Sequence, residues 1–389
     1  LGSRVPLGRA KDLCLLEIAM QVFLEDVTDQ MCGPPVPPTT GSLTWAFPSV
    51  SGAAPPPRGG HTSTLLGAFL YVIGGADREQ TYAAKVHRFH VRDLAWEEVE
   101  VEGMAPTPRG GHSAVAWGAE GVVVHGGLNI QREKFFSDLW VLHAPSGGGP
   151  ATWTEPSREG VPPLERNSHA AVLLSEGPLK HSMVVIGGGS PEGLLASIQI
   201  ADLSRLPETV TWSNAKHPSL SGFTGREMMA AAIMGRQLLV FGGRIDASEG
   251  GAAGDGVSDE LVTFDTHSLA LLATDKTGAA RCAHTLTALS HNLCVATGGI
   301  DMTGPFALRE SILFRFDIQD AAVEATTGAE REAATAIDLS WETLDQPEQV
   351  PLLTRPLLTC PLLISLRCSP DHCTPVLNRH CRRSFFFFF

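Results

Sequence analysis

The strongest constraint on the fold is a sequence pattern that occurs five times. In four copies an arginine is followed three residues later by a histidine, at residues 58–61, 109–112, 166–169 and 281–284. The remaining copy keeps Arg226 and has Met229 in the histidine position. An apolar run follows each arginine and ends in a double glycine, which begins 16, 17, 21, 16 and 17 positions after the arginine. Such recurrence indicates a repeat architecture, in which each unit buries its faces against its neighbours.

A further β-rich run completes each unit, and a tryptophan follows it in most of them. The runs after the double glycines span residues 85–91, 138–142, 198–203, 260–265 and 312–317. A tryptophan stands 13 or 14 residues before four of the arginines, at Trp45, Trp96, Trp153 and Trp212, and Leu269 lies near this place in the fourth unit. The runs before the glycines, such as 71–73 and 238–241, are continuously apolar, which is typical of strands buried on both faces. A double glycine suits a strand end that needs positive φ and close backbone approach.

Together, the arginine, histidine, apolar strand, double glycine, third strand and tryptophan resemble the kelch repeat over about residues 43–345. The resemblance implies an all-β fold, a kelch-type β-propeller with five recognisable four-stranded blades. Trp45 fits the outer strand of a closing blade built from both chain ends. Arg355 lies in phase after Trp341, but Leu358 replaces the histidine and no double glycine follows. We therefore predict six blades with the closing one damaged, and five blades are the alternative.

Two segments flank the predicted propeller. Residues 1–42 are predicted to be an N-terminal helical segment or the remnant of a lost domain, because residues 10–31 have an amphipathic pattern. Residues 346–389 are rich in leucine, proline and cysteine and end in five phenylalanines. We expect them to be an irregular tail, either disordered or an artefact of the gene model.

Charge and composition exclude some classes of partner. The 389 residues include 42 acidic and 29 basic ones, for a net charge of −13, which argues against a nucleic-acid surface. No apolar run reaches the roughly 18–20 residues that a membrane helix needs. The eight cysteines are scattered through a large chain, which favours reduced thiols in the cytoplasm, with the nucleus as the alternative.

The sequence predicts no catalytic residue, metal or cofactor. The repeated histidines occur once per blade, so we expect them to bond backbone near the innermost strands, not to hold a metal. The copper-radical oxidases that resemble galactose oxidase need two tyrosines in the site, one of them cross-linked to a cysteine. This chain has two tyrosines in all, Tyr71 and Tyr82, and Tyr71 lies in an apolar strand, where we expect it to fill the core. The iron-binding spacing of the plant specifier proteins is absent. The tail residues Cys368, His372, Cys373, His380 and Cys381 lack the close pair typical of zinc sites.

Partner binding is predicted on the face that carries the loops after the second strands. These loops contain Arg78, Arg132 and Arg244, and five repeated arginines stand at the mouths of the innermost strands: Arg58, Arg109, Arg166, Arg226 and Arg281. In kelch adaptors of ubiquitin ligases, arginines at similar strand mouths bind acidic peptides or chain ends. The alternative is that the repeated arginines bridge neighbouring blades.

The resemblance therefore implies a non-enzymatic scaffold or adaptor that binds another protein, such as an acidic peptide segment or a C-terminus, in a ubiquitin-ligase assembly. The alternative function is a regulatory kelch domain of a larger enzyme. An F-box or BTB domain upstream would favour the adaptor.

Overall fold

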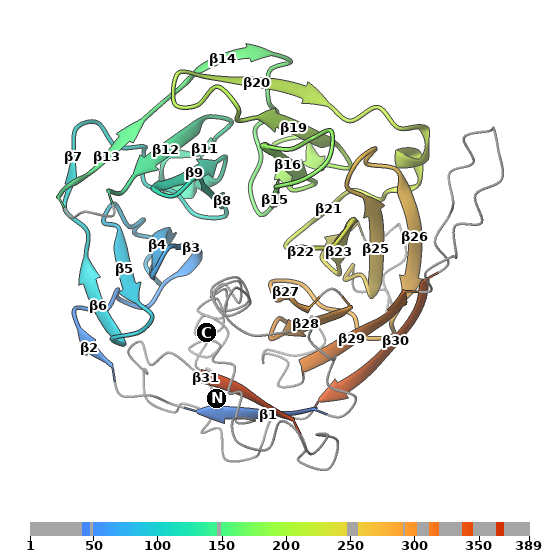
Figure 1. The fold of residues 1–389 in the computed structure, drawn as a ribbon. Coiled ribbons are helices and arrows are strands. Elements are labelled where there is room, and N and C mark those ends of the chain that lie inside the picture. The colour runs from blue at the N-terminus through green and yellow to red at the C-terminus, as the bar shows by residue number, and fades with distance from the viewer. Residues whose placement is uncertain are drawn as a thin grey trace, which may run out of the picture.

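The chain forms a ring of antiparallel sheets around a central channel (Figure 1). A computed structural model describes residues 50–145, 149–246, 256–290 and 292–301, together with the strands β1 (Gly41–Ala46), β29 (Ser311–Ile318), β30 (Ile337–Leu344) and β31 (Leu363–Cys368). In this part of the chain the only helices are two short 3-10 turns, Ile130–Arg132 and Pro218–Gly222. The prediction of an all-β propeller is confirmed.

Five sheets correspond to the five sequence repeats. From the channel outward, the first blade contains β3 (Gly59–Leu66), β4 (Phe69–Ala76), β5 (His87–His90) and β6 (Ala95–Glu98). The second contains β8 (Ser113–Trp117), β9 (Gly121–His125), β12 (Leu139–His143) and β13 (Ala151–Thr154). The third contains β15 (Ala170–Leu174), β16 (Ser182–Ile186), β19 (Ile198–Asp202) and β20 (Thr209–Asn214). The fourth contains β22 (Ala230–Met234), β23 (Gln237–Phe241), β25 (Glu260–Asp265) and β26 (Leu271–Lys276), and the fifth contains β27 (Thr285–Ser290), β28 (Leu293–Thr297), β29 and β30.

The first three blades have a fifth strand that the sequence did not predict. The short strands β2 (Ser51–Gly52), β7 (Val101–Glu102) and β14 (Ser157–Gly160) run parallel to the outer strands β6, β13 and β20. Each of β7 and β14 follows the outer strand of one blade and pairs with the outer strand of the next. A Cβ atom at Gly160 would lie 2.1 Å from the carbonyl oxygen of Trp212, so only glycine allows this approach. These strands therefore fasten neighbouring blades at the rim.

Two strands from opposite ends of the sequence meet at the remaining position of the ring (Figure 1). Strand β1 contains Trp45 and pairs antiparallel with β31, with Trp45 opposite Ile364. Strand β31 lies inside the segment that the sequence predicted to be irregular. The helix predicted over residues 10–31 lies outside the described residues, and so do Arg355 and Leu358. The domain bounds stay predictions.

The hydrophobic core lies between the blades. On strand β9, Val122 and Val124 pack toward the first blade, while Val123 between them packs toward the third. All three side chains are at most 1% exposed. A strand between two neighbouring sheets buries both faces, which explains why these strands are continuously apolar in sequence.

Three short two-stranded sheets stand after the second strands or at the blade entrances. They pair β10 (Leu128–Asn129) with β11 (Lys134–Phe135), β17 (Gly189–Ser190) with β18 (Gly193–Leu194), and β21 (Arg226–Glu227) with β24 (Arg244–Ile245). Isolated bridges join Gly110 to Leu128 and Asn167 to Gly189. The loops after the second strands and those that enter the innermost strands therefore share one face, here called the loop face, as the sequence predicted.

Candidate interaction face and channel

The repeated arginines brace their own blades. All five are at most 6% exposed, and each donates from Nη1 to the carbonyl oxygen of the first residue of its own double glycine. These bonds are 3.2 Å for Arg58, 3.0 Å for Arg109, 2.7 Å for Arg166, 3.3 Å for Arg226 and 3.1 Å for Arg281. Each bond ties the mouth of the innermost strand to the end of the second strand of the same blade.

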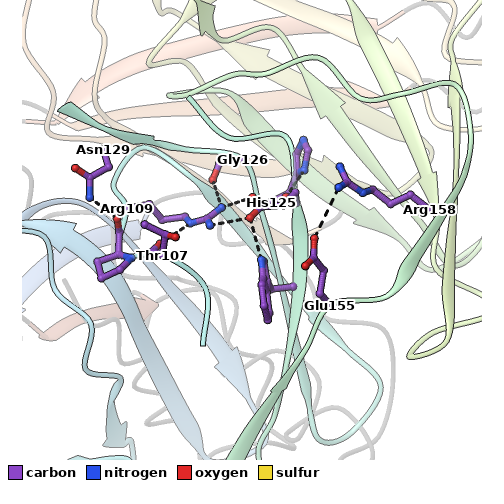
Figure 2. A network of polar contacts seen from close by, with 10 residues as sticks. Thr107, Arg109, His125, Gly126, Asn129, Glu155 and Arg158 are labelled. Atoms are coloured by element: carbon purple, nitrogen blue, oxygen red, sulfur yellow. Dashed lines mark hydrogen bonds and ion pairs between the residues drawn. The ribbon is translucent and has the colours of Figure 1, made fainter. Parts of the chain in front are cut away.

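Arg109 shows how such a guanidinium is satisfied (Figure 2). Its Nε donates to the carbonyl oxygen of Thr107 at 2.9 Å, and its Nη1 and Nη2 form a two-point contact with Asp138, where Nη2 lies 2.9 Å from Oδ2. Trp140 Nε1 donates to the same carboxylate oxygen at 2.9 Å. Burial alone would raise the pKa of Asp138, but the hydrogen bonds and charge of Arg109 outweigh it and lower the pKa.

The side chain that bonds the repeated arginine from the third strand, or from just before it, differs between blades. Arg226 pairs with Glu260 at 2.7 Å, whereas Arg166 donates to Ser197 at 3.1 Å and to Gln199 at 2.6 Å. Neither of these two partners of Arg166 carries a charge, and burial lowers the pKa of Arg166 to about 10. A neutral acceptor suits a buried cation less than a carboxylate does.

These contacts correct the predicted role of the repeated arginines. We expected Arg58, Arg109, Arg166, Arg226 and Arg281 to face a partner at the channel mouth, but their donors point back into their blades. Arg109, Arg166 and Arg226 would have to break bonds within the blade to bind a partner, and all five side chains are at most 6% exposed. The alternative of blade bridging is also only partly right, because the side chains join strands within one blade.

The double glycines form the contact with the next blade. Both residues of each pair have positive φ, from 58° to 104° over the five pairs, as the sequence predicted. The second glycine donates its N–H to the carbonyl oxygen of the next blade's arginine at 2.7–2.8 Å, in the four junctions from Gly75–Arg109 to Gly243–Arg281. The first glycine leaves no room for a side chain, because a Cβ atom at Gly242 would lie 2.2 Å from the carbonyl oxygen of Arg281.

The repeated histidines also join blades. His112 Nε2 lies 2.9 Å from the hydroxyl of Thr62, and His169 Nε2 lies 2.8 Å from the hydroxyl of Ser113. In both cases the hydroxyl belongs to the preceding blade, a side-chain partner that we did not expect. The expected bond to neighbouring backbone is found for His112, which contacts the backbone of Ile73. Burial lowers the pKa of His61 to about 4 and that of His112 to about 3, which keeps both rings neutral at physiological pH.

A belt of backbone hydrogen bonds surrounds the channel mouth. The residue two positions after each repeated arginine has positive φ in all five blades: Gly60, Gly111, Ser168, Met228 and Ala283, with φ from 51° to 69°. Its N–H donates to the carbonyl oxygen of the equivalent residue in the preceding blade, at 2.6–2.8 Å in the four junctions from Gly111–Gly60 to Ala283–Met228. The left-handed conformation is uncommon for serine, methionine and alanine, so the belt holds these residues against local preference.

A cavity of about 610 Å3 opens at this mouth. Its wall includes the belt and the first residues of the innermost strands, and many of these residues are small, among them Ser63, Ala114, Ala171 and Ala231. Ile130 and Met228 line it as well and are 54% and 37% exposed. The size is in the range of pockets that enclose a small ligand or a short peptide segment.

The three predicted loop arginines are exposed, in contrast to the repeated ones. Arg78 lines the cavity, and Asp77 holds its loop by accepting the N–H of Glu79 at 3.0 Å and that of Thr81 at 2.8 Å. Arg132 ends the turn after β10. Arg244 donates from Nε to the buried Glu227 at 2.8 Å, so part of its charge is neutralised.

Sequence reasoning missed the apolar side chains on the loop face. Ile130 stands alone between Asn129 and Gln131, and Met228 begins the apolar run of its innermost strand, so neither gives a signal of its own. Met228 lies two positions after Arg226, where other repeats have a glycine, serine or alanine. A comparison of the five copies at that position could have singled it out.

Within the described ranges no three His, Cys, Asp or Glu side chains gather as metal ligands would. The cysteines and histidines of the tail lie outside the side chains that the structure describes. Among the described residues no helix has the length and apolar character needed to cross a membrane. Tyr71 is buried in β4, where the sequence placed it, and the hydroxyl of Tyr82 accepts the N–H of Ile130 at 3.2 Å.

Comparison with known families decides the classification. The family model of the KLHDC2/KLHL20/DRC7 Kelch-repeats domain matches residues 38–243. The chain belongs to the kelch-repeat family. The kelch propeller is also similar to the solved structure of YjhT, with a TM-score of 0.52 and 15% identity over 73% of this chain and 84% of that one, a likeness that concerns the fold alone.

Three relatives illustrate where kelch segments of this kind occur. Host cell factor 1 of Homo sapiens is 30% identical over 217 residues, which cover 52% of this chain and 10% of that protein. Acyl-CoA-binding domain-containing protein 4 of Arabidopsis thaliana is 26% identical over 203 residues, with shares of 52% and 29%. Rab9 effector protein with kelch motifs of Rattus norvegicus is 41% identical over 99 residues, with shares of 25% and 26%.

The chain thus matches only 10–29% of the length of these relatives. Kelch-repeat propellers in homologous proteins are typically protein-interaction domains.

Proposed function

We propose that this kelch propeller is a non-enzymatic protein-interaction module whose partner binds the loop face and inserts an extended segment into the channel mouth. The observation that carries the proposal is the cavity of about 610 Å3 on that face. An opening of this size admits a few residues of a peptide but no folded domain. The rest of the partner would therefore lie across the surrounding loops.

The exposed side chains at the mouth suit such a partner. Ile130 in the second blade and Met228 in the fourth are large apolar groups on the rim, and exposed apolar groups beside polar ones are typical of interaction surfaces. Arg78 adds a guanidinium at the cavity, and Arg132 adds another on the same face. Because guanidinium groups form two-point bonds with carboxylates, an acidic peptide segment or a free C-terminus remains our proposed ligand.

The proposal is tested by changing the rim and comparing the partners that are retained. Ile130→Asp combined with Met228→Asp places charges on the apolar rim, and aspartate tolerates the positive φ of residue 228 better than most residues. Leu272→Asp is the matched control, since Leu272 is 52% exposed on the outer strand β26, away from the mouth. Tagged full-length chains would be isolated from cells, and their partners quantified by mass spectrometry.

We expect the double variant to lose the main partners and the Leu272 variant to keep them. Unfolding curves of all three chains must coincide for the comparison to hold. If the folded double variant keeps every partner of the unchanged chain, the loop face is not the binding surface. Binding through Arg78 and Arg132 should also weaken as salt rises, since exposed charges are screened.

Membership of a ubiquitin-ligase assembly is a further part of the proposal. An F-box or BTB domain encoded upstream in the full transcript would support it. A catalytic domain in that transcript would favour the second candidate function, regulation of an attached enzyme.

A further inference from the structure

The belt around the channel mouth carries one large side chain. Four of its five residues have a small side chain or none: Gly60, Gly111, Ser168 and Ala283. The fifth is Met228, whose φ of 55° is a left-handed conformation that is uncommon for a residue with a Cβ atom. Glycine adopts this conformation without strain, so the belt itself gives no reason for a methionine at this position.

The belt bonds of Met228 involve its backbone and not its side chain. Its N–H donates to the carbonyl oxygen of Ser168 at 2.7 Å, and its own carbonyl oxygen accepts the N–H of Ala283 at 2.8 Å. Met228 lines the cavity and is 37% exposed, whereas the next residue, Met229, is buried in the hydrophobic core. Burial therefore accounts for Met229, while Met228 leaves apolar surface open at the channel mouth, where a ligand can contact it.

The fourth blade presents an apolar wall beside this methionine. Four consecutive residues of that blade line the cavity, and none has a polar side chain: Met228, Met229, Ala230 and Ala231. Each of the other four described blades places a histidine in the second of these positions, and the first blade adds the hydroxyls of Thr62 and Ser63. Ala230 and Ala231 are half-buried and end in a single methyl group. Among the described blades, the fourth therefore offers a ligand apolar contact where the others offer polar side chains.

We propose that the partner segment inserts an aliphatic side chain against the fourth blade, and that Met228 packs on this side chain and sets its size. The inference rests on the proposed function, because it needs a partner segment in the channel mouth. A methionine side chain is unbranched and flexible, so it adapts its shape to leucine, isoleucine or valine. It also occupies part of the mouth, which leaves less room for an aromatic ring.

The decisive variant is Met228→Gly, which copies the belt residue of the first two blades and removes the side chain. The probe is a library of random peptides displayed on phage and selected against the full chain. Peptides retained by the unchanged chain should be enriched in leucine, isoleucine or valine at one position. Met228→Gly should bind these peptides about five- to thirtyfold more weakly, the loss expected when an apolar contact of this kind is removed. A selection against Met228→Gly should shift that position to phenylalanine, tyrosine or tryptophan, because the space of the methionine becomes available.

Met104→Gly is the matched control, because Met104 is 77% exposed between β7 and Arg109 and is not among the residues that line the cavity. It removes the same side chain and should leave peptide affinity and preference unchanged. Met228→Ala copies the belt residue of the fifth blade and keeps a Cβ atom, so it should lose affinity even if Met228→Gly alters the backbone of the mouth. Thermal unfolding should show Met228→Gly to be at least as stable as the unchanged chain, since glycine relieves the strain of the left-handed conformation.

The outcomes distinguish this inference from the proposed function. Three results would overturn the inference alone: retained peptides without an aliphatic preference, equal binding of these peptides by both Met228 variants, or a large loss of stability in Met228→Gly. The last of these would show that the side chain supports the fold. Failure of the unchanged chain to retain any peptide would overturn the channel mouth as a peptide site and the inference with it.

Discussion

Replacing Gly242 should reveal how closely neighbouring blades approach. Gly242 has φ +63°, and Gly235, in the turn between β22 and β23, has φ +56°. Alanine at either position must adopt the left-handed conformation, which costs about 1–2 kcal/mol. Around Gly235 no atom lies within 4 Å of an added Cβ atom, whereas at Gly242 that atom would lie 2.2 Å from the carbonyl oxygen of Arg281. The two variants therefore share the conformational cost and differ in the clash.

The clash has two consequences at the junction of the fourth and fifth blades. The backbone of Arg281 must shift, and overpacking of this kind costs about 1–3 kcal/mol. The same carbonyl accepts the N–H of Gly243 at 2.8 Å, so the shift also strains a bond between the blades. We expect Gly242→Ala to lower the free energy of unfolding by about 2–5 kcal/mol, the sum of both costs. Gly235→Ala should lower it by only about 1–2 kcal/mol.

Urea unfolding followed by tryptophan fluorescence measures this difference, since Trp96, Trp153 and Trp212 are buried in the blades. The dependence of the free energy on urea should be alike in the unchanged chain and both variants, so that midpoints can be compared. Equal losses for Gly242→Ala and Gly235→Ala would refute the reasoning, because they would show that the carbonyl of Arg281 does not confine the glycine.

Three other predictions follow from the blade contacts. Asp138→Asn removes the charged partner of buried Arg109 and should lower the free energy of unfolding at neutral pH by about 1.5–3 kcal/mol. Because the pKa of Asp138 is lowered in the fold, the unchanged chain should lose this contribution as pH falls below about 4. Chemical unfolding at several pH values should then show the free energies of unfolding of the two chains converging at low pH. Burial lowers the pKa of His112 from 6.5 to about 3, so stability should fall as the pH drops through this interval. His112→Met should reduce the slope of stability against pH by about 1.4 kcal/mol per pH unit there, and an unchanged slope would contradict the burial argument. Removing residues 1–50 deletes β1 and bares the edge of β31, so light scattering should show aggregation or earlier unfolding, whereas a stable monomer would mean that ring closure does not need β1.

Much of the fold could be predicted from the sequence because its determinants repeat. The interval between the arginine and the double glycine, such as Arg226 to Gly242, recurs in every unit with small changes. Only a ring or solenoid of equivalent sheets gives each copy of such a motif the same structural environment. The glycine requirement was also predictable, since a pair of glycines after a buried apolar strand has few other uses. Trp45 predicted that the segment around it joins the far end of the chain, and it does pair with β31.

The direction of the repeated arginines was decided only by tertiary structure. The sequence places Arg109 at the mouth of an innermost strand, but Asp138, which holds its guanidinium inside the blade, lies 29 residues further along. The residue two positions after each arginine adopts positive φ because a backbone belt joins it to the preceding blade, and no local preference of Ser168 or Met228 predicts that conformation. The side-chain partners of His112 and His169 likewise come from the preceding repeat, about 50 residues earlier, at Thr62 and Ser113. Local sequence fixed which side chains stand at the strand mouths, whereas contacts between distant strands and neighbouring blades determined which of them point inward and which remain available on the loop face.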